Sequence, residues 1–266
     1  MVNDIISRNF FRRLAMIGFF DAEFNSLRQS DGNFDYSLID IAVIPCKSKK
    51  QMPVKKPFQS FCRPEKNNGK VYQAIRELTN IPQSVIDKAE GFTVVYRAFR
   101  EYILRHNITK IFTWGGSDLP MMNWNCEFYD IPKEERDILD LFVDIAPDIC
   151  SKLGTKSVTS VENASFICNC RKRDRHNALD DAISLHEIVY ATEMKQFSKK
   201  RARQFHEFEG HRSDFLMAKQ LMESLKLHGT DINELIEHIN NGEKFPSFFE
   251  YLSQNDELPL KKQESA

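Results

Sequence analysis

The sequence lacks the long apolar run that marks a membrane-spanning protein. No segment of the 266-residue chain holds the roughly 18 uninterrupted apolar side chains that a bilayer-spanning helix requires. The first residues, Met-Val-Asn-Asp-Ile-Ile-Ser-Arg, also lack the basic-then-apolar order of a secretory signal. We therefore expect no membrane association and a cytoplasmic protein.

An excess of either charge is absent too. The 37 Lys and Arg residues nearly balance the 38 Asp and Glu residues, which leaves a formal net charge of -1. The sequence therefore has no overall basic excess that would indicate a nucleic-acid-binding protein, and any contact with a polyanion must come from local basic clusters.

Cysteines are few and scattered. We expect reduced thiols, because a chain of this length folds without cross-links; the six cysteines stand at positions 46, 62, 126, 150, 168 and 170. Cys168-Asn-Cys170 has the spacing of half a zinc site, but no second pair of Cys or His residues with zinc-finger spacing accompanies it. With 41% hydrophobic residues, the chain can bury one sizeable core and a small appendage.

The most informative stretch is the apolar run at residues 16–24, which contains Asp21 and Glu23. A β-strand sends alternate side chains to opposite faces, so these two carboxylates point together, away from the apolar side chains between them. Neighbouring carboxylates repel, and burial raises their pKa unless a cation compensates. A hard divalent ion such as Mg²⁺ or Mn²⁺ would do so. A strand that ends in two solvated acids explains these residues equally well.

Hydrophobic patterns beyond this stretch predict an α/β fold. Strands are expected at 36–45, 57–63, 110–114 and 139–144, and the first two of these should form an antiparallel meander with residues 16–24. Apolar residues at helical spacing predict helices at 92–106, 119–129, 147–153 and 160–166, a long helix from 178, and a short one between Pro82 and Gly91.

Another acid stands at the end of a predicted strand. Asp118 follows Gly115-Gly116-Ser117, at the point where the strand gives way to a helix. The carboxyl ends of strands are where open α/β sheets place their sites. The alternative is that Asp118 simply caps the helix, which is a position that Asp prefers.

A histidine and a further acid flank the start of the long helix. Asp181 is in phase with Ala178 and Leu185, so it should project from the apolar face of the helix toward the sheet. Asp180 is about 100° away around the helix, so it should lie toward solvent or serve the first turn. His176, just before the helix, can lean over the same site. The alternatives are a capping histidine and a hydrogen-bonded core aspartate.

Three motifs in this order resemble the DEDDh exonucleases of RNase H-like fold, which include RNase T and the proofreading subunit of bacterial replicative polymerase. The motifs are Phe20-Asp-Ala-Glu-Phe24, Thr113-Trp-Gly-Gly-Ser-Asp118 and His176-Asn-Ala-Leu-Asp-Asp181-Ala182. The setting of Asp118, together with Phe61-Cys-Arg-Pro64 and Leu78-Thr-Asn-Ile81, is most similar to the sporulation-inhibitor-type and histone-mRNA-type branch. The resemblance covers roughly residues 14–193.

This resemblance implies an RNase H-like mixed sheet flanked by helices, and a metal-dependent 3′-5′ exonuclease that acts on single-stranded 3′ ends of RNA or DNA. It assigns His176 as general base, and two Mg²⁺ or Mn²⁺ ions to Asp21, Glu23, Asp118 and Asp181. A catalytically inactive binding or scaffold module of the same fold, and an RNase H-like endonuclease, remain as alternatives.

Substrate contacts are less clearly marked. Phe24 and the Leu78 segment are candidates to stack on or wedge beside terminal bases, with Ala22 beside them, although Phe24 lies on the core side of its strand. Relatives often carry Thr or Ser soon after the Glu of the first motif, where this chain has Phe24-Asn25. Phosphate contacts are expected from the basic loop before His176, which contains Arg171, Lys172, Arg173 and Arg175. The alternative is that this loop is simply solvated.

The remaining sequence divides the chain. We expect an N-terminal extension at 1–12, the exonuclease domain at 13–195, a helical appendage at 196–255 and a disordered tail at 256–266. Basic residues between 195 and 203 precede apolar residues at helical spacing over 213–227, and a capping box begins at Asp231. The basic run either extends a nucleic-acid track or forms a solvated helix face. The C-terminal helices are a candidate surface for a protein partner or for self-association.

Overall fold

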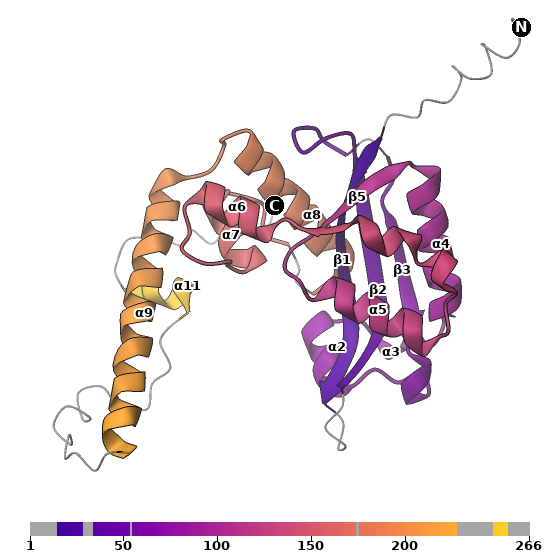
Figure 1. Ribbon diagram of the computed structural model, residues 1–266, viewed down its shortest axis with the longest axis horizontal. Coiled ribbons are helices and arrows are strands. Elements are labelled where there is room, and N and C mark those ends of the chain that lie inside the picture. The colour runs from indigo at the N-terminus through magenta and orange to yellow at the C-terminus, as the bar shows by residue number, and fades with distance from the viewer. Residues whose placement is uncertain (1–14, 29–33, 54, 174–175, 228–246, 255–266) are drawn as a thin grey trace, which may run out of the picture.

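A mixed six-stranded sheet forms the centre of the molecule. The computed structural model describes residues 15–28, 34–53, 55–173, 176–227 and 247–254. Within them the strands lie in the order β4-β3-β2-β1-β5-β6 (Figure 1). Their bounds are β1 Met16–Arg28, β2 Phe34–Cys46, β3 Phe58–Arg63, β4 Glu90–Gly91, β5 Ile108–Thr113 and β6 Phe142–Asp144.

The central strand β1 is antiparallel to β2 and parallel to β5. Because its side chains alternate, Phe19 packs in the core on one face and Phe20 in the core on the other. Helix α8 (Ala178–Glu193) covers the Phe19 face, and helices α4 (Phe92–Arg105) and α5 (Asp118–Phe128) cover the Phe20 face. The predicted α/β sheet flanked by helices is confirmed.

Most predicted helices are present. The further helices in the described chain are α2 Gln73–Thr79, α3 Gln83–Ile86, α6 Ala146–Leu153, α7 Val161–Ile167, α9 Lys199–Leu227 and α11 Phe248–Gln254. Short 3₁₀ turns lie at Glu65–Asn67, Lys133–Glu135 and Asp137–Leu141. Ser160 caps α7, because its side chain accepts a hydrogen bond from the Asn163 nitrogen. None of the helices in these parts of the chain is long and apolar enough to cross a membrane.

One predicted strand was too long. The strand expected at 139–144 begins only at Phe142, because residues 137–141 form a 3₁₀ turn. Ile138 and Leu139 are consecutive, and both are buried in the same core. A strand would send adjacent side chains to opposite faces, whereas a tight turn lets both enter one core.

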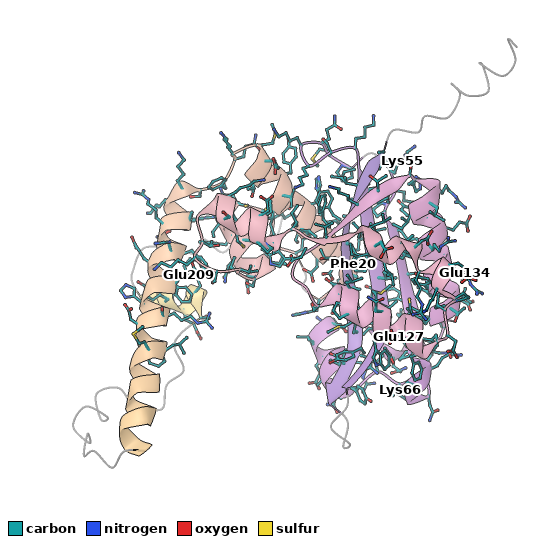
Figure 2. All side chains as sticks on the ribbon, in the orientation of Figure 1. Phe20, Lys55, Lys66, Glu127, Glu134 and Glu209 are labelled. Atoms are coloured by element: carbon teal, nitrogen blue, oxygen red, sulfur yellow. The ribbon has the colours of Figure 1, made fainter. Side chains whose placement is uncertain are left out.

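Helix α9 is joined to the rest of the fold at its beginning. Ala202, Phe205 and Phe208 continue the core cluster that lies under α8, and Phe248 of α11 packs into the same cluster. Glu209 accepts hydrogen bonds from the backbone of residues 156 and 157, which fastens α9 to the segment after α6 (Figure 2). The rest of this 29-residue helix extends away from the sheet (Figure 1).

Some predictions fall outside the described residues. They are the N-terminal extension 1–12, the capping box at Asp231 and the tail 256–266. The division at residue 195, and a partner surface on the C-terminal helices, stay predictions.

Candidate active site

Three carboxylates from two distant parts of the chain converge beside β1. Asp21 and Glu23 of β1 and Asp181 of α8 each offer an oxygen, and these oxygens lie within 4.8 Å of one another. The alternation of β1 puts the first two side chains on the face that α8 covers, and the phase of α8 turns Asp181 toward them. We call these residues the carboxylate trio.

The start of α8 is fixed by its own cap. The Asn177 side chain accepts hydrogen bonds from the backbone nitrogens of Leu179 and Asp180, at 3.1 and 3.2 Å. Before it, His176 has a left-handed backbone with φ of 59°, a conformation that His adopts more readily than most residues. The His176 nitrogen donates to Asp181 Oδ2 at 3.0 Å. The predicted base is therefore tied through its backbone to a member of the carboxylate trio.

Asp118 stands at the start of α5, the helix that follows β5, the parallel neighbour of β1. It is the first residue of α5 and is only 7% exposed. Ser117, not Asp118, occupies the N-cap position, so the capping alternative is wrong. Gly115 has φ of 93°, a left-handed value that favours glycine, and its nitrogen donates to Asp144 Oδ1 at 2.9 Å. This turn brings the start of α5 close enough for the Asp118 charge to act on Asp21.

Helix α5 is held in register by a buried amide. Asn125 Oδ1 accepts from the Leu38 nitrogen at 3.1 Å, and its Nδ2 donates to the Tyr36 oxygen at 2.7 Å. Both partners belong to β2, so α5 is hydrogen-bonded directly to the sheet. The position of Asp118 therefore depends on the sheet as well as on its glycine turn.

Burial and mutual repulsion raise the pKa of these acids. The pKa of Asp21 is well above its usual range, mainly because of burial and then because of the charges of Asp118, Glu23 and Asp181. Burial, followed by the charge of Asp181, raises the pKa of Glu23 to about 8. Burial raises the pKa of Asp118 to about 7. Clustered carboxylate oxygens whose negative charge is disfavoured fit a hard divalent cation, which would neutralise them.

A further buried acid was missed by the sequence analysis. Asp40 lies opposite Glu23 in the β1–β2 register and is fully buried, so the two carboxylates share a face of the sheet. Burial raises the pKa of Asp40 to about 6. The sequence analysis predicts only an apolar strand at residues 36–45, although a single acid between Ile39 and Ile41 already indicates a carboxylate within that strand.

Asp40 connects the sheet to α8. Its Oδ2 accepts a hydrogen bond from the nitrogen of Ala178, the first residue of α8, at 3.3 Å. Gln59 Nε2 on β3 donates to both oxygens of Asp40, at 3.1 and 3.3 Å. These bonds hold the end of α8 that carries Asp181 against β2.

The predicted substrate contacts differ in their exposure. Phe24 and Ala22 are buried, at 8% and 9% exposure, and both pack in the core on the α4 side. Leu78, on α2, is 49% exposed and is accessible to a base. Arg171 is exposed and lines a pocket beside Asp181. Arg175 lies outside the described residues.

Metal binding should strengthen as the pH rises. Glu23 has a folded-state pKa of about 8, above its ordinary value of 4.5, so the metal-free fold loses stability as the pH rises through this window. A divalent ion replaces the retained protons, so we expect Mn²⁺ or Mg²⁺ to raise the melting temperature more at about pH 8 than at about pH 6. At an ion concentration 100 times Kd, the gain is about 2.7 kcal/mol. Calorimetry of the parent and Asp21→Asn checks this; an equal shift in both proteins, or at both pH values, would contradict it.

Replacing Asp40 should loosen the start of α8. In Asp40→Asn an amide NH₂ faces either Gln59 or the Ala178 nitrogen, and the unsatisfied donor costs about 1–3 kcal/mol. Adding Gln59→Glu restores an acceptor opposite that amide and keeps the number of carboxylates constant, so it should recover much of the loss. Urea unfolding gives the stabilities, and amide hydrogen exchange in the first turn of α8 gives the local effect. If the double variant is no more stable than Asp40→Asn, these bonds do not hold the helix.

The chain is similar to known exonucleases. A probable 3′-5′ exonuclease, KapD of Bacillus subtilis (strain 168), is 26% identical over 145 residues, which are 54% of this chain and 68% of that protein.

Solved structures show the same fold. The 3′-exonuclease in a structure of 3′-end-specific recognition of a histone mRNA stem-loop is 17% identical, covers 73% of this chain and 69% of its own, and has a TM-score of 0.57. The nuclease domain of 3′hExo, a DEDDh family member bound to rAMP, is 15% identical, covers 70% and 96%, and has a TM-score of 0.55. The six-stranded sheet and its helices are therefore an RNase H-like exonuclease fold.

The family model described as exonuclease, RNase T, matches residues 19–189. This range contains the trio, Asp118, His176 and Asp40, and it is well over half of the chain. The chain therefore belongs to the exonuclease (RNase T) family.

Proposed function

We propose that this exonuclease removes nucleotides from single-stranded 3′ ends of RNA or DNA by a two-metal mechanism, and that it releases nucleoside 5′-monophosphates. The observation that carries the proposal is the convergence of Asp21, Glu23 and Asp181 within 4.8 Å, with Asp118 close by, in a chain of this family. Two Mg²⁺ or Mn²⁺ ions would, when bound, lower the charge on the scissile phosphate and assist both attack and departure.

The acids of this site have different roles in the proposal. Asp21 is central, because the charges of Asp118, Glu23 and Asp181 all act on it, and we assign it to both ions. Glu23 would hold one ion and orient the attacking water. Asp118 at the start of α5 and Asp181 on α8 would complete the ligand set.

His176 is proposed to take the proton from the attacking water. An imidazole can act as a general base at neutral pH, and such a base contributes about 10²–10⁴-fold to the rate. Its backbone bond to Asp181 Oδ2, at 3.0 Å, supports the assignment because it keeps the residue beside the carboxylate trio.

A cytoplasmic location is part of the proposal, and the thiols support it. All six cysteines are free, and Cys170 alone among them is not buried. Free thiols suit a reducing compartment, so we place this activity in the cytoplasm.

Activity should depend on Asp181 and not on its neighbour Asp180. With a 5′-labelled oligonucleotide and Mg²⁺ or Mn²⁺, the parent should give a ladder that shortens from the 3′ end. His176→Ala should lower kcat by about 10²–10⁴-fold, and Asp181→Asn should lower it at least as much. Asp180→Asn, an equal change in charge one residue away on α8, serves as the matched control. If Asp181→Asn digests as fast as the parent, the proposed site is wrong.

Three further measurements separate the rival functions and the preferred substrate. Cutting of a circular single strand would indicate an endonuclease. A parent protein that binds no metal in a calorimetric titration would indicate an inactive binding module. Matched RNA and DNA oligonucleotides show which sugar is preferred, since the 2′-hydroxyl distinguishes them.

A further inference from the structure

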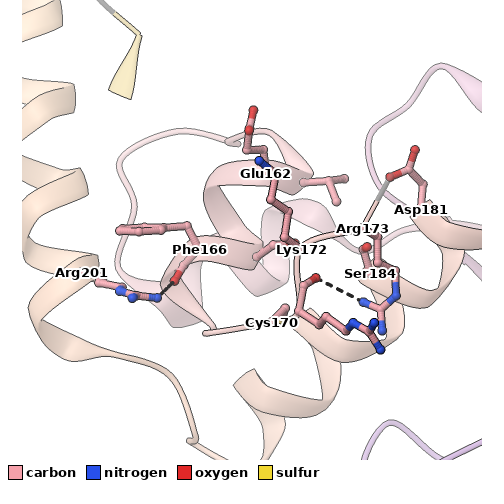
Figure 3. Close-up of a pocket in the computed structure, with 11 residues that line it drawn as sticks. Glu162, Phe166, Cys170, Lys172, Arg173, Asp181, Ser184 and Arg201 are labelled. Atoms are coloured by element: carbon pink, nitrogen blue, oxygen red, sulfur yellow. Dashed lines mark hydrogen bonds between the residues drawn. The ribbon is translucent and has the colours of Figure 1, made fainter. Parts of the chain in front are cut away.

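A pocket of about 420 Å³ lies next to the proposed catalytic site. It is formed by α7, the loop that follows it, α8 and the beginning of α9 (Figure 3). Asp181 lines this pocket and also belongs to the carboxylate trio. Figure 3 shows Asp181 on one side of the pocket, and Phe166 and Arg201 on the other. The pocket therefore leads away from the metal site toward α9.

The loop before α8 places basic side chains along this pocket. Arg173 binds Glu187 of α8 through two hydrogen bonds of 2.5 and 2.6 Å, and it also donates to the Arg171 oxygen at 3.4 Å. Arg173 thus braces the loop. Arg171 and Lys172 line the same pocket and are exposed to solvent. Arginine and lysine side chains in this position suit the phosphates of a nucleic-acid backbone.

The opposite wall of the pocket consists of the aromatic ring of Phe166 and the guanidinium group of Arg201. The Arg201 guanidinium lies 4.1 Å from the centre of the Phe166 ring, and Nη1 donates to the Phe166 oxygen at 2.8 Å. Arg201 belongs to α9, whereas the exonuclease family match ends at residue 189. The C-terminal helix therefore contributes to a wall that reaches toward the catalytic site.

The two sides of the pocket match the two parts of a nucleotide. An aromatic ring and the aliphatic stems of basic side chains suit a base or a sugar, and the charged groups of Arg171 and Lys172 suit phosphates. Two acids also line the pocket. Asp181 is a proposed metal ligand, and Glu162 lies at the start of α7. The basic residues among the lining outnumber these acids, even though Arg173 is paired with Glu187.

We propose that this pocket holds the single-stranded segment on the 5′ side of the scissile bond, with Arg171 and Lys172 at its phosphates and the Phe166–Arg201 wall against a base or sugar. The inference rests on the proposed function. A 3′-exonuclease has one nucleotide on the 3′ side of the bond it cuts and the whole remaining strand on the 5′ side. This pocket adjoins Asp181 and carries basic side chains, so it suits the remaining strand. Arg201 then makes the beginning of α9 part of the substrate-binding surface.

The test compares a substrate that reaches the pocket with one that does not. The long substrate is a 5′-labelled single-stranded oligonucleotide, as RNA and as DNA. The short substrate is the p-nitrophenyl ester of thymidine 5′-monophosphate, which has the terminal nucleotide and the scissile ester but no 5′ strand. The variant carries Arg171→Glu and Lys172→Glu, and its melting temperature is measured first. The matched control carries Lys55→Glu and Lys56→Glu, an equal change in charge at two consecutive exposed lysines before β3, which line neither the pocket nor the carboxylate trio.

We expect the Arg171/Lys172 variant to raise KM for the oligonucleotide by about tenfold or more, with a loss on the nitrophenyl ester of no more than about threefold. The dependence of log KM on log salt concentration should become shallower by about 0.7 for each phosphate that the variant no longer neutralises. The control should stay within about twofold of the parent on both substrates.

The other outcomes are distinct. Equal losses on both substrates would place the terminal nucleotide in this pocket and overturn the proposal. An unchanged KM for the oligonucleotide, or an equal loss in the control, would also overturn it while leaving the exonuclease function standing. A parent protein that hydrolyses neither substrate would refute the proposed function, and this inference with it.

Discussion

Like charge gathered in a half-buried cluster is the constraint on which the rest of this structure depends. Asp21, Glu23 and Asp181 share a space in which their oxygens lie within 4.8 Å, and burial raises the pKa of Glu23 to about 8. Such a cluster costs free energy unless protons or a cation neutralise it. It persists because the apolar side chains of β1, among them Phe20 and Phe24, fill the opposite core. Because side chains alternate along a strand, Asp21 and Glu23 must then lie on the face that α8 covers.

The docking of α8 converts this cluster into a site. Asn177 caps the helix, the nitrogen of Ala178 bonds to Asp40, and the nitrogen of His176 bonds to Asp181. The donors in these bonds are backbone nitrogens in the first turn of the helix or just before it. Such nitrogens have no acceptor within the helix. A few consecutive residues thereby fix the direction of the helix and the place of the predicted base. The carboxylate of Asp40 contributes to the repulsion and to the docking at once.

Periodicity made much of this arrangement predictable. The alternation of residues 16–24 indicated that Asp21 and Glu23 point together, and the phase with Ala178 singled out Asp181 over Asp180. Both arguments are local, because each needs only the geometry of a single strand or helix. Asp40 could not be assigned in this way. Its position opposite Glu23 depends on the β1–β2 register, which shifts at a bulge just after Glu23, and no sequence pattern indicates that shift.

Contacts between distant elements were beyond local patterns for the same reason. The 3₁₀ turn at 137–141 arises because two consecutive apolar residues enter one core. The contact of Arg201 with Phe166 joins two segments whose sequences show only a basic run and a short helix. Charge and periodicity can identify a basic helix, but the surface it meets is set by tertiary packing.

The packing of α9 explains how a segment beyond the family match can line the pocket beside Asp181. Ala202, Phe205 and Phe208 continue the core that α8 covers, so the beginning of α9 has little freedom to turn. Arg201 precedes this apolar group directly, and its orientation toward Phe166 follows from the burial of its neighbours. The carboxylate trio itself comes from β1 and α8, and none of its members belongs to α9. A change in the apolar residues of α9 therefore acts on the pocket beside Asp181 through the position of Arg201.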